Sequence, residues 1–201
     1  MALFDVALHY RFAQASRLGR DFDLRTMFSD TLIGRNALNC VTFVDNHDSQ
    51  PGHALENWVQ DWFKPLAYAF ILLRKDGYPC VFYGDYCGIS GAHPIPGKGG
   101  VLDPLLLARS RYAYGEQHDY FDHANTVGWT RLGDAEHPDS GLACVLSNGE
   151  DGIKRMQMGA YAANARFRDL TGNIQDVIQT DGGGWADFRC RGGSVSVWVR
   201  E

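Results

Sequence analysis

Three polar residues that could contact a sugar follow a short apolar run near the middle of the first half of the chain. The run covers residues 41–44, and Asn46, His47 and Asp48 come shortly after it. A carboxylate and an imidazole at the end of a strand could bind sugar hydroxyls or stabilise a developing positive charge. Polar residues at strand ends also commonly satisfy the hydrogen bonds of a loop. The pattern alone leaves both a substrate site and a structural turn open.

A second cluster of metal-ligating residue types contains His118, Asp119, Asp122 and His123. Zinc is disfavoured there because the spacing lacks the His-Glu-x-x-His pattern, in which both histidines lie on one helix face. The sequence also contains no Gly-x-Ser-x-Gly nucleophile elbow and no phosphate-binding glycine loop. These motifs therefore point to no metalloprotease, serine hydrolase or nucleotide-binding enzyme.

The elements that must position these residues change character near residue 115. Before it, residues 4–10, 41–44 and 80–83 form short strand-like runs. Each run is followed by a polar or glycine-containing stretch and then by a helical pattern. This order predicts βα units that share a parallel sheet.

The predicted helices of the first part have recognisable ends. Apolar residues recur at three- and four-residue steps over residues 55–73, where Pro65 either kinks one helix or begins a second. Asp103 and Pro104 are typical of an N-cap followed by a first-turn proline. A shorter helix is predicted over residues 24–32.

After residue 115 the pattern becomes that of short strands separated by turns. In the last run three valines alternate with Ser194, Ser196 and Trp198, which predicts a sheet buried on one side. Trp198 is therefore expected at the surface, where its ring could stack on a sugar. The spacing favours an antiparallel sandwich. The predicted strands cover residues 126–131, 142–147, 153–159, 167–170, 177–180, 185–190 and 194–200.

Composition excludes several classes of protein. Hydrophobic residues make up 45% of the 201 residues, enough for a packed core. The net charge of -5 and the lack of a Lys/Arg run disfavour a nucleic-acid partner. No apolar stretch approaches the roughly 18 residues of a membrane span, and no secretory leader is recognised. Five scattered cysteines favour free thiols in a reducing compartment, which indicates the cytoplasm.

Several motifs, in order along the chain, resemble those of one enzyme family. Residues 41–48, Val-Thr-Phe-Val-Asp-Asn-His-Asp, resemble the fourth signature region of α-amylase-type glycoside hydrolases. The likeness is closest to the liquefying bacterial α-amylases and their cytoplasmic relatives, and it extends over nearly the whole chain. It is also carried by residues 62–70, 77–85, 112–115, 118–123, 127–131 and 192–196.

The resemblance implies an α/β part followed by an all-β part. Residues 1–115 would form about units six to eight of a (β/α)8 (TIM) barrel, the C-terminal part of the catalytic domain. Residues 116–201 would form an antiparallel Greek-key β-sandwich. A closed barrel needs eight units, so this fraction would leave strands with open edges. We therefore expect the missing N-terminal part of the barrel, or a second copy of the chain, as a partner.

The resemblance also implies roles for the residues after the first motif. Asp48 matches the aspartate that stabilises the oxocarbenium-like transition state, and His47, Asn46 and Gln50 are assigned to substrate binding. The family's nucleophile and acid/base motifs are absent from the chain. Retaining cleavage needs two carboxylates about 5 Å apart, so the chain is expected to be inactive alone.

A calcium site between the two parts is implied by the same resemblance. Its predicted ligands are Arg20, Phe22, His118, Asp119 and Asn148. Asn148 departs from the family's acidic residue, which removes one charge and weakens calcium binding. An interdomain hydrogen-bond knot is the alternative.

Two functions follow from these observations. The first is the C-terminal part of an α-amylase that hydrolyses internal α-1,4-glucosidic bonds of starch or glycogen with retention. The second is a non-catalytic carbohydrate-binding or interaction protein derived from an amylase. Affinity for maltooligosaccharides separates them, because half of a catalytic site should bind poorly.

Overall fold

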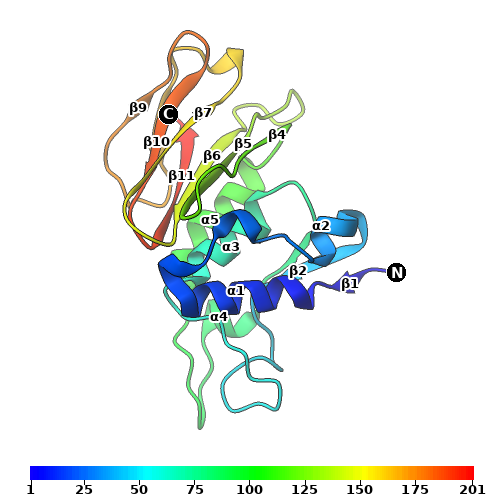
Figure 1. The fold of residues 1–201 in the computed structure, drawn as a ribbon. Helices are drawn as coiled ribbons and strands as arrows, with labels where there is room; N and C mark the ends of the chain where they lie inside the picture. Colours follow the sequence, from blue (N-terminus) through cyan, green and yellow to red (C-terminus); the bar gives the residue numbers. More distant parts are fainter.

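The computed structural model describes residues 1–201 as a helix-rich part that leads into a β-rich part (Figure 1). The helix-rich part contains a three-stranded parallel sheet in the order β1-β2-β3, so β2 is central. Its elements are β1 (Leu3–Phe4), α1 (Val6–Leu18), α2 (Leu32–Asn36), β2 (Cys40–Phe43), α3 (Lys64–Leu73), β3 (Tyr78–Cys80), α4 (Tyr83–Cys87) and α5 (Gly99–Arg111). Short 3-10 turns cover Gly19–Asp21, Leu24–Thr26 and Ala37–Asn39. The prediction of a parallel sheet is confirmed for this part.

The β-rich part consists of a six-stranded sheet and a two-stranded sheet. The larger sheet has the order β4-β5-β6-β11-β8-β9, and β7 pairs with β10 in the smaller one. All these pairings are antiparallel, as the turn pattern predicts. The strands are β4 (Gln117–Tyr120), β5 (Thr126–Arg131), β6 (Leu142–Ser147), β7 (Gly152–Gln157), β8 (Arg166–Asp169), β9 (Ile178–Gln179), β10 (Trp185–Cys190) and β11 (Ser194–Arg200).

One hydrophobic core joins the two parts. Helix α3 packs against one face of the six-stranded sheet, where its Phe70 stacks on Trp129 with ring centroids 5.5 Å apart, and α5 packs on α3. A second core lies between the two sheets and contains Phe167, Phe188 and Trp198. The six-stranded sheet is therefore covered on both faces. None of the helices has the length and apolar composition that crossing a membrane requires.

The prediction that Trp198 faces solvent is wrong. Its side chain is fully buried in the second core, and its indole N–H donates to the Arg189 carbonyl at 2.9 Å. Strand β11 has its valines against the helices and Trp198 against the smaller sheet. The valines and Trp198 do lie on opposite faces of the strand, as the alternation predicts, but both faces are buried.

The predicted strand over residues 4–10 is also wrong, because α1 begins at Val6. The Asp5 carboxylate accepts from the Leu8 backbone N–H at 3.0 Å and caps this helix. The same carboxylate accepts from the Ile33 backbone N–H at 2.8 Å at the start of α2. One buried aspartate therefore caps α1 and also accepts from the first turn of α2, whose own N-cap is Thr31. A sequence pattern cannot reveal this second contact.

Three predicted helix boundaries also change. Residues 55–63 are not helical, so Pro65 lies in the first turn of α3, which begins at Lys64, rather than kinking a longer helix. Helix α5 begins before the predicted cap, and Asp103 instead accepts from the Tyr86 hydroxyl at 2.7 Å. Residues 24–32 form a 3-10 turn and the start of α2 instead of one helix.

Candidate functional site

The predicted substrate residues lie in a turn at the carboxyl end of the central strand β2. The Asn46 side-chain oxygen accepts from the backbone N–H groups of Asp48 at 2.9 Å and Ser49 at 3.0 Å. Asn46 therefore holds the turn, which is the structural alternative raised by its sequence position. Its side-chain oxygen is occupied by backbone donors and is not free for a sugar.

His47 and Asp48 project from this turn into solvent. The side chains are 80% and 56% exposed, and His47 Nε2 lies 3.4 Å from Asp48 Oδ1. An exposed carboxylate beside an imidazole can accept hydrogen bonds from hydroxyl groups and stabilise a nearby positive charge. The Gln50 side-chain amide contacts His53 Nε2 at 2.7 Å.

A buried charge cluster lies beneath the turn. Lys64, the first residue of α3, is fully buried and binds Asp45 Oδ2 at 2.7 Å and also Asp85. The Tyr68 hydroxyl donates to Asp85 Oδ2 at 2.7 Å. Ser49 donates to Asp45 Oδ1 at 2.8 Å, which connects the cluster to the exposed turn. The cluster therefore fixes the base of the segment that carries His47 and Asp48.

Burial controls the protonation of this cluster. Removal from water raises the pKa of the Asp45 carboxyl to about 7, against the opposing effect of the Lys64 ammonium. One lysine faces two carboxylates, and the Asp85 charge raises the pKa of Asp45 further. Desolvation also raises the pKa of Tyr68 far above its ordinary range, so its hydroxyl stays a donor.

The sequence did not point to this cluster as a unit. Asp45 directly follows the apolar run, but Lys64 and Tyr68 lie within the apolar pattern of α3. Their four-residue spacing places both on one helix face, and this spacing was the only indication in the sequence that they act together. The Trp58 ring, whose centroid is 3.1 Å from Lys64 Nζ, covers the ammonium group.

The buried cluster supplies no free carboxylate that could act together with Asp48. Asp45 and Asp85 are both fully buried and bound by Lys64, so neither can attack or protonate a substrate. A retaining glycosidase needs two working carboxylates at one bond. The turn therefore offers one exposed carboxylate with a neighbouring imidazole, which suits binding and charge stabilisation.

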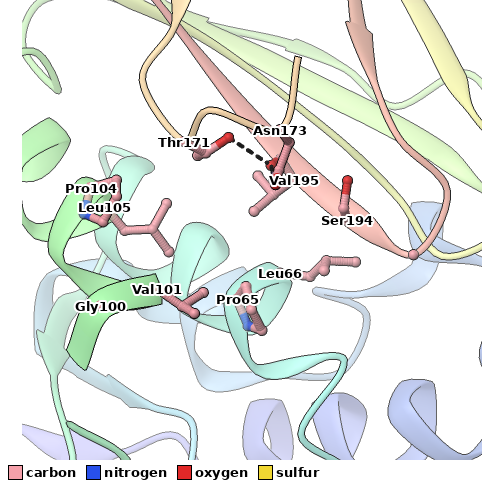
Figure 2. A pocket seen from close by; sticks show the side chains of 11 residues that line it. Pro65, Leu66, Gly100, Val101, Pro104, Leu105, Thr171, Asn173, Ser194 and Val195 are labelled. Carbon is pink, nitrogen blue, oxygen red and sulfur yellow. Dashed lines mark hydrogen bonds between the residues drawn. The ribbon is translucent and has the colours of Figure 1, made fainter. Parts of the chain in front are cut away.

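A pocket between the two parts has a different character. It has a volume of about 260 Å³ and lies between α3, α5 and β11 (Figure 2). Pro65, Leu66 and Leu105 line one side, and the Thr171 and Asn173 side chains both donate to the Val195 carbonyl on the other. The lining contains no ionisable side chain, so it offers no acid, base or nucleophile.

Only part of the predicted calcium-ligand set comes together. Asn148 meets the Phe22 carbonyl and, through Asn125, the Arg20 carbonyl, whereas His118 and Asp119 have other partners. The Asp119 carboxylate forms a two-pronged ion pair with Arg74, at 2.7 and 2.8 Å, and His118 Nε2 lies 3.1 Å from Glu116. Asn148 instead donates its amide hydrogens to the Gly19 and Phe22 carbonyls, each at 2.8 Å. No group of three or more His, Cys, Asp or Glu side chains has a metal-binding arrangement. These residues do not fit a calcium ion, which requires several anionic oxygens.

The chain is similar to α-amylases over nearly its whole length. The α-amylase C-terminal family model matches residues 142–199. The chain is 54% identical over 199 residues to an alpha-amylase of Geobacillus stearothermophilus, covering 99% of this chain and 36% of that protein. It is 46% identical over 211 residues to the cytoplasmic alpha-amylase of Escherichia coli (strain K12), covering 99% and 42%.

A solved structure with the same fold is that of wild-type alpha-amylase I from Eisenia fetida. It has a TM-score of 0.71 and 12% identity, and the match covers 100% of this chain and 49% of that one. The chain therefore spans less than half the length of each of these relatives. The identities over 99% of the chain, together with the family model, show that the chain belongs to the α-amylase family and corresponds to a C-terminal portion of its members.

Proposed function

We propose that the chain supplies the C-terminal part of a starch- or glycogen-hydrolysing α-amylase. In this proposal residues 1–115 are about units six to eight of the (β/α)8 barrel, and residues 116–201 are its sandwich domain. The enzyme cleaves internal α-1,4-glucosidic bonds with retention. The 54% identity to an alpha-amylase over 99% of the chain supports this proposal.

The observation that carries the proposal is the exposed pair His47 and Asp48 at the end of β2. Their 3.4 Å contact leaves both side chains facing solvent, while the neighbouring aspartates are buried. In parallel α/β sheets, substrates bind at the carboxyl ends of strands. Asp48 would stabilise the positive charge of the transition state, and His47 would bind a sugar hydroxyl. Asn46 contributes by shaping the turn, and Gln50 is proposed to contact substrate beside His53.

The proposed partner is the N-terminal part of a barrel. Both outer strands of the parallel sheet are open, and both carry exposed large side chains, Phe4 on β1 and Tyr78 on β3. An edge strand presents unpaired backbone N–H and C=O groups, so these edges suit pairing with further strands. A second copy of this chain would cover the same edges when the N-terminal part is absent.

A cytoplasmic location is part of the proposal. All five cysteines are unpaired, and Cys80 and Cys87 are exposed. Exposed free thiols persist best in a reducing compartment. One of the relatives is named as a cytoplasmic enzyme.

Reducing-sugar release from soluble starch tests the function. The purified chain alone should release none above the background of an Asp48→Ala variant. Co-expression with the N-terminal portion of the Geobacillus stearothermophilus relative should restore activity, and Asp48→Ala should lower it at least about a hundredfold. Asp30→Ala, which removes an exposed carboxylate on the loop before α2, is the matched control and should keep the restored activity.

Activity of the chain alone that Asp48→Ala abolishes would contradict the proposed division of roles. Restored activity that survives Asp48→Ala would contradict the role of Asp48. Calorimetry with maltoheptaose distinguishes the alternative function, because tight binding by the chain alone would favour a carbohydrate-binding protein.

A further inference from the structure

A pair of asparagines joins the helix-rich part to the β-rich part. Asn148 follows β6, and Asn125 precedes β5. The Asn148 side chain donates to the Gly19 and Phe22 carbonyls, each at 2.8 Å, and Asn125 donates to the Arg20 carbonyl at 2.6 Å. Three carbonyl oxygens of the segment after α1 therefore converge on two amide groups of the sheet.

The two asparagines are also bonded to each other. Asn125 donates its second amide hydrogen to the Asn148 side-chain oxygen at 2.9 Å, and the Asn148 backbone N–H donates to the Asn125 carbonyl at 3.2 Å. All four amide hydrogens of the pair thus have acceptors, and the buried Asn148 has no free donor. The cluster is closed without any further ligand.

Two of the carboxylates near the pair are already bound, whereas the exposed Glu150 lines the same surface hollow as Asn125. The Asp151 carboxylate binds Arg191 at 2.9 Å and the Gly192 backbone N–H at 2.8 Å. The Asp122 carboxylate binds Lys154. Asp119 is further away, because it pairs with Trp129 in the β4–β5 register, three residues or about 10 Å along β5 from Thr126. The polar groups that meet within the cluster itself are therefore amide hydrogens and carbonyl oxygens, with no carboxylate among them.

We propose that Asn125 and Asn148 form a metal-independent clamp between the two parts of the chain. The clamp takes the place of the interdomain calcium site that the family resemblance implies. Each amide supplies hydrogen-bond donors to the carbonyl oxygens that a cation would otherwise bind. Exchange of both amides for carboxylates should make the clamp bind calcium, because two carboxylates facing three carbonyls make a site for a hard cation.

Thermal unfolding of the full chain tests the clamp, and its outcome does not depend on catalysis. The melting temperature of the unmodified chain should change by less than about 1 °C between millimolar calcium and a chelator. Asn125→Asp/Asn148→Asp should be less stable in chelator, because carboxylates then face carbonyl oxygens. Calcium about a hundredfold above its Kd should raise the melting temperature of this variant by roughly 5 °C.

A matched control uses the second asparagine pair of the chain. Asn36 and Asn39 contact each other at 3.4 Å on the exposed surface, with no facing carbonyl cluster. Asn36→Asp/Asn39→Asp adds the same charge and should gain no calcium response. If Asn125→Asp/Asn148→Asp does not fold in chelator, Asn148→Asp alone allows the same comparison.

Two results would overturn the proposal. One is a rise of several degrees in the melting temperature of the unmodified chain with calcium, together with one-to-one calcium binding in calorimetry. The other is a folded Asn125→Asp/Asn148→Asp variant whose melting temperature is the same in calcium and in chelator.

Discussion

Strands β1 to β3 and strands β4 to β11 differ in how completely the fold encloses them. All residues of β5 and β6 and the five central residues of β11 are buried. Both residues of β1 and the two ends of β3 are exposed, and Tyr78 is 74% exposed. The central strands of the six-stranded sheet are covered on both faces, by the smaller sheet and by the helices, whereas the parallel sheet has one central strand between two exposed edge strands. The β-rich part is thus more completely enclosed than the sheet that carries Asp48.

The first way to break this comparison is to remove the centre of the sandwich. Trp198→Ala should lower the free energy of unfolding by about 4 kcal/mol, because it empties a fully buried indole site next to Phe188. Tyr78→Ala, on the open edge of the parallel sheet, should change it by less than about 0.5 kcal/mol. Urea unfolding followed by circular dichroism measures both. Equal effects would contradict the difference in enclosure.

The second prediction concerns the buried cluster beneath the site. Lys64→Met should cost about 3 kcal/mol, because it leaves Asp45 and Asp85 buried without a cation. Protonation of the two aspartates in the variant would remove their buried charge and reduce this loss of stability. Arg35→Met breaks the exposed pair with Asp30 and should cost under about 0.5 kcal/mol. A Lys64→Met chain as stable as the Arg35→Met chain would show that the cluster contributes nothing.

The third prediction is a pH dependence of stability. The pKa of Asp45 is about 7 in the folded chain and near 4 when unfolded, so the carboxyl is protonated in both states below about pH 4. Between about pH 4 and pH 7 the unfolded chain loses this proton first. The contribution of Asp45 to the free energy of unfolding should therefore fall as pH rises. The fall is on the order of 1 kcal/mol for each unit by which the folded pKa exceeds the unfolded pKa.

Urea unfolding between pH 5 and pH 8 measures this slope. Asp45→Asn keeps the shape of the side chain and removes its titration, so its slope should be flatter than that of the unmodified chain. Asp139→Asn, which alters an exposed aspartate in the loop before β6, is the control and should leave the slope unchanged. A slope unaffected by Asp45→Asn would contradict the raised pKa.

The smallest expected effect concerns the open edge itself. Phe4 is 58% exposed on β1, and burial of a Phe side chain contributes about 1.5–3 kcal/mol. Phe4→Lys should therefore weaken self-association about tenfold or more, as sedimentation equilibrium measures it. Ile153→Lys changes an exposed apolar residue of the sandwich and should leave association unchanged. A chain that is monomeric at all concentrations, or equally affected by both variants, would contradict an open edge on β1.

The β-rich half could be predicted well because its local signals agree with its structure. The bounds of β5, β6, β10 and β11 match the predicted runs, since turn residues separate short strands with strong β-propensity. Strand β4 was missed, because residues 117–120 are polar and half exposed. Such a strand forms by pairing with β5 rather than from its own composition.

The helix-rich half was harder to predict because distant contacts decide its elements. Asp5 ends the first strand by capping α1. Its carboxylate also accepts from the backbone N–H groups of Leu32 and Ile33 in α2, which lie 27 and 28 residues further along the chain. The segment before α3 stays irregular, where the Asn57 backbone N–H donates to the Ser49 carbonyl and the Val59 N–H to Asp45. Helical periodicity over residues 55–73 could not outweigh these bonds.

The sequence by itself determined the family of the chain, its change from an α/β part to an all-β part, and the place of His47 and Asp48 after a strand. Motifs and turn residues carry this information locally, so they can be read without coordinates. The tertiary structure alone decided that Trp198 is buried and that Lys64 binds Asp45 after β2 and Asp85 in α4. It also decided that Asn125 rather than Asp119 meets Asn148. These outcomes depend on which distant segments come into contact, because burial and charge pairing are properties of the packed chain.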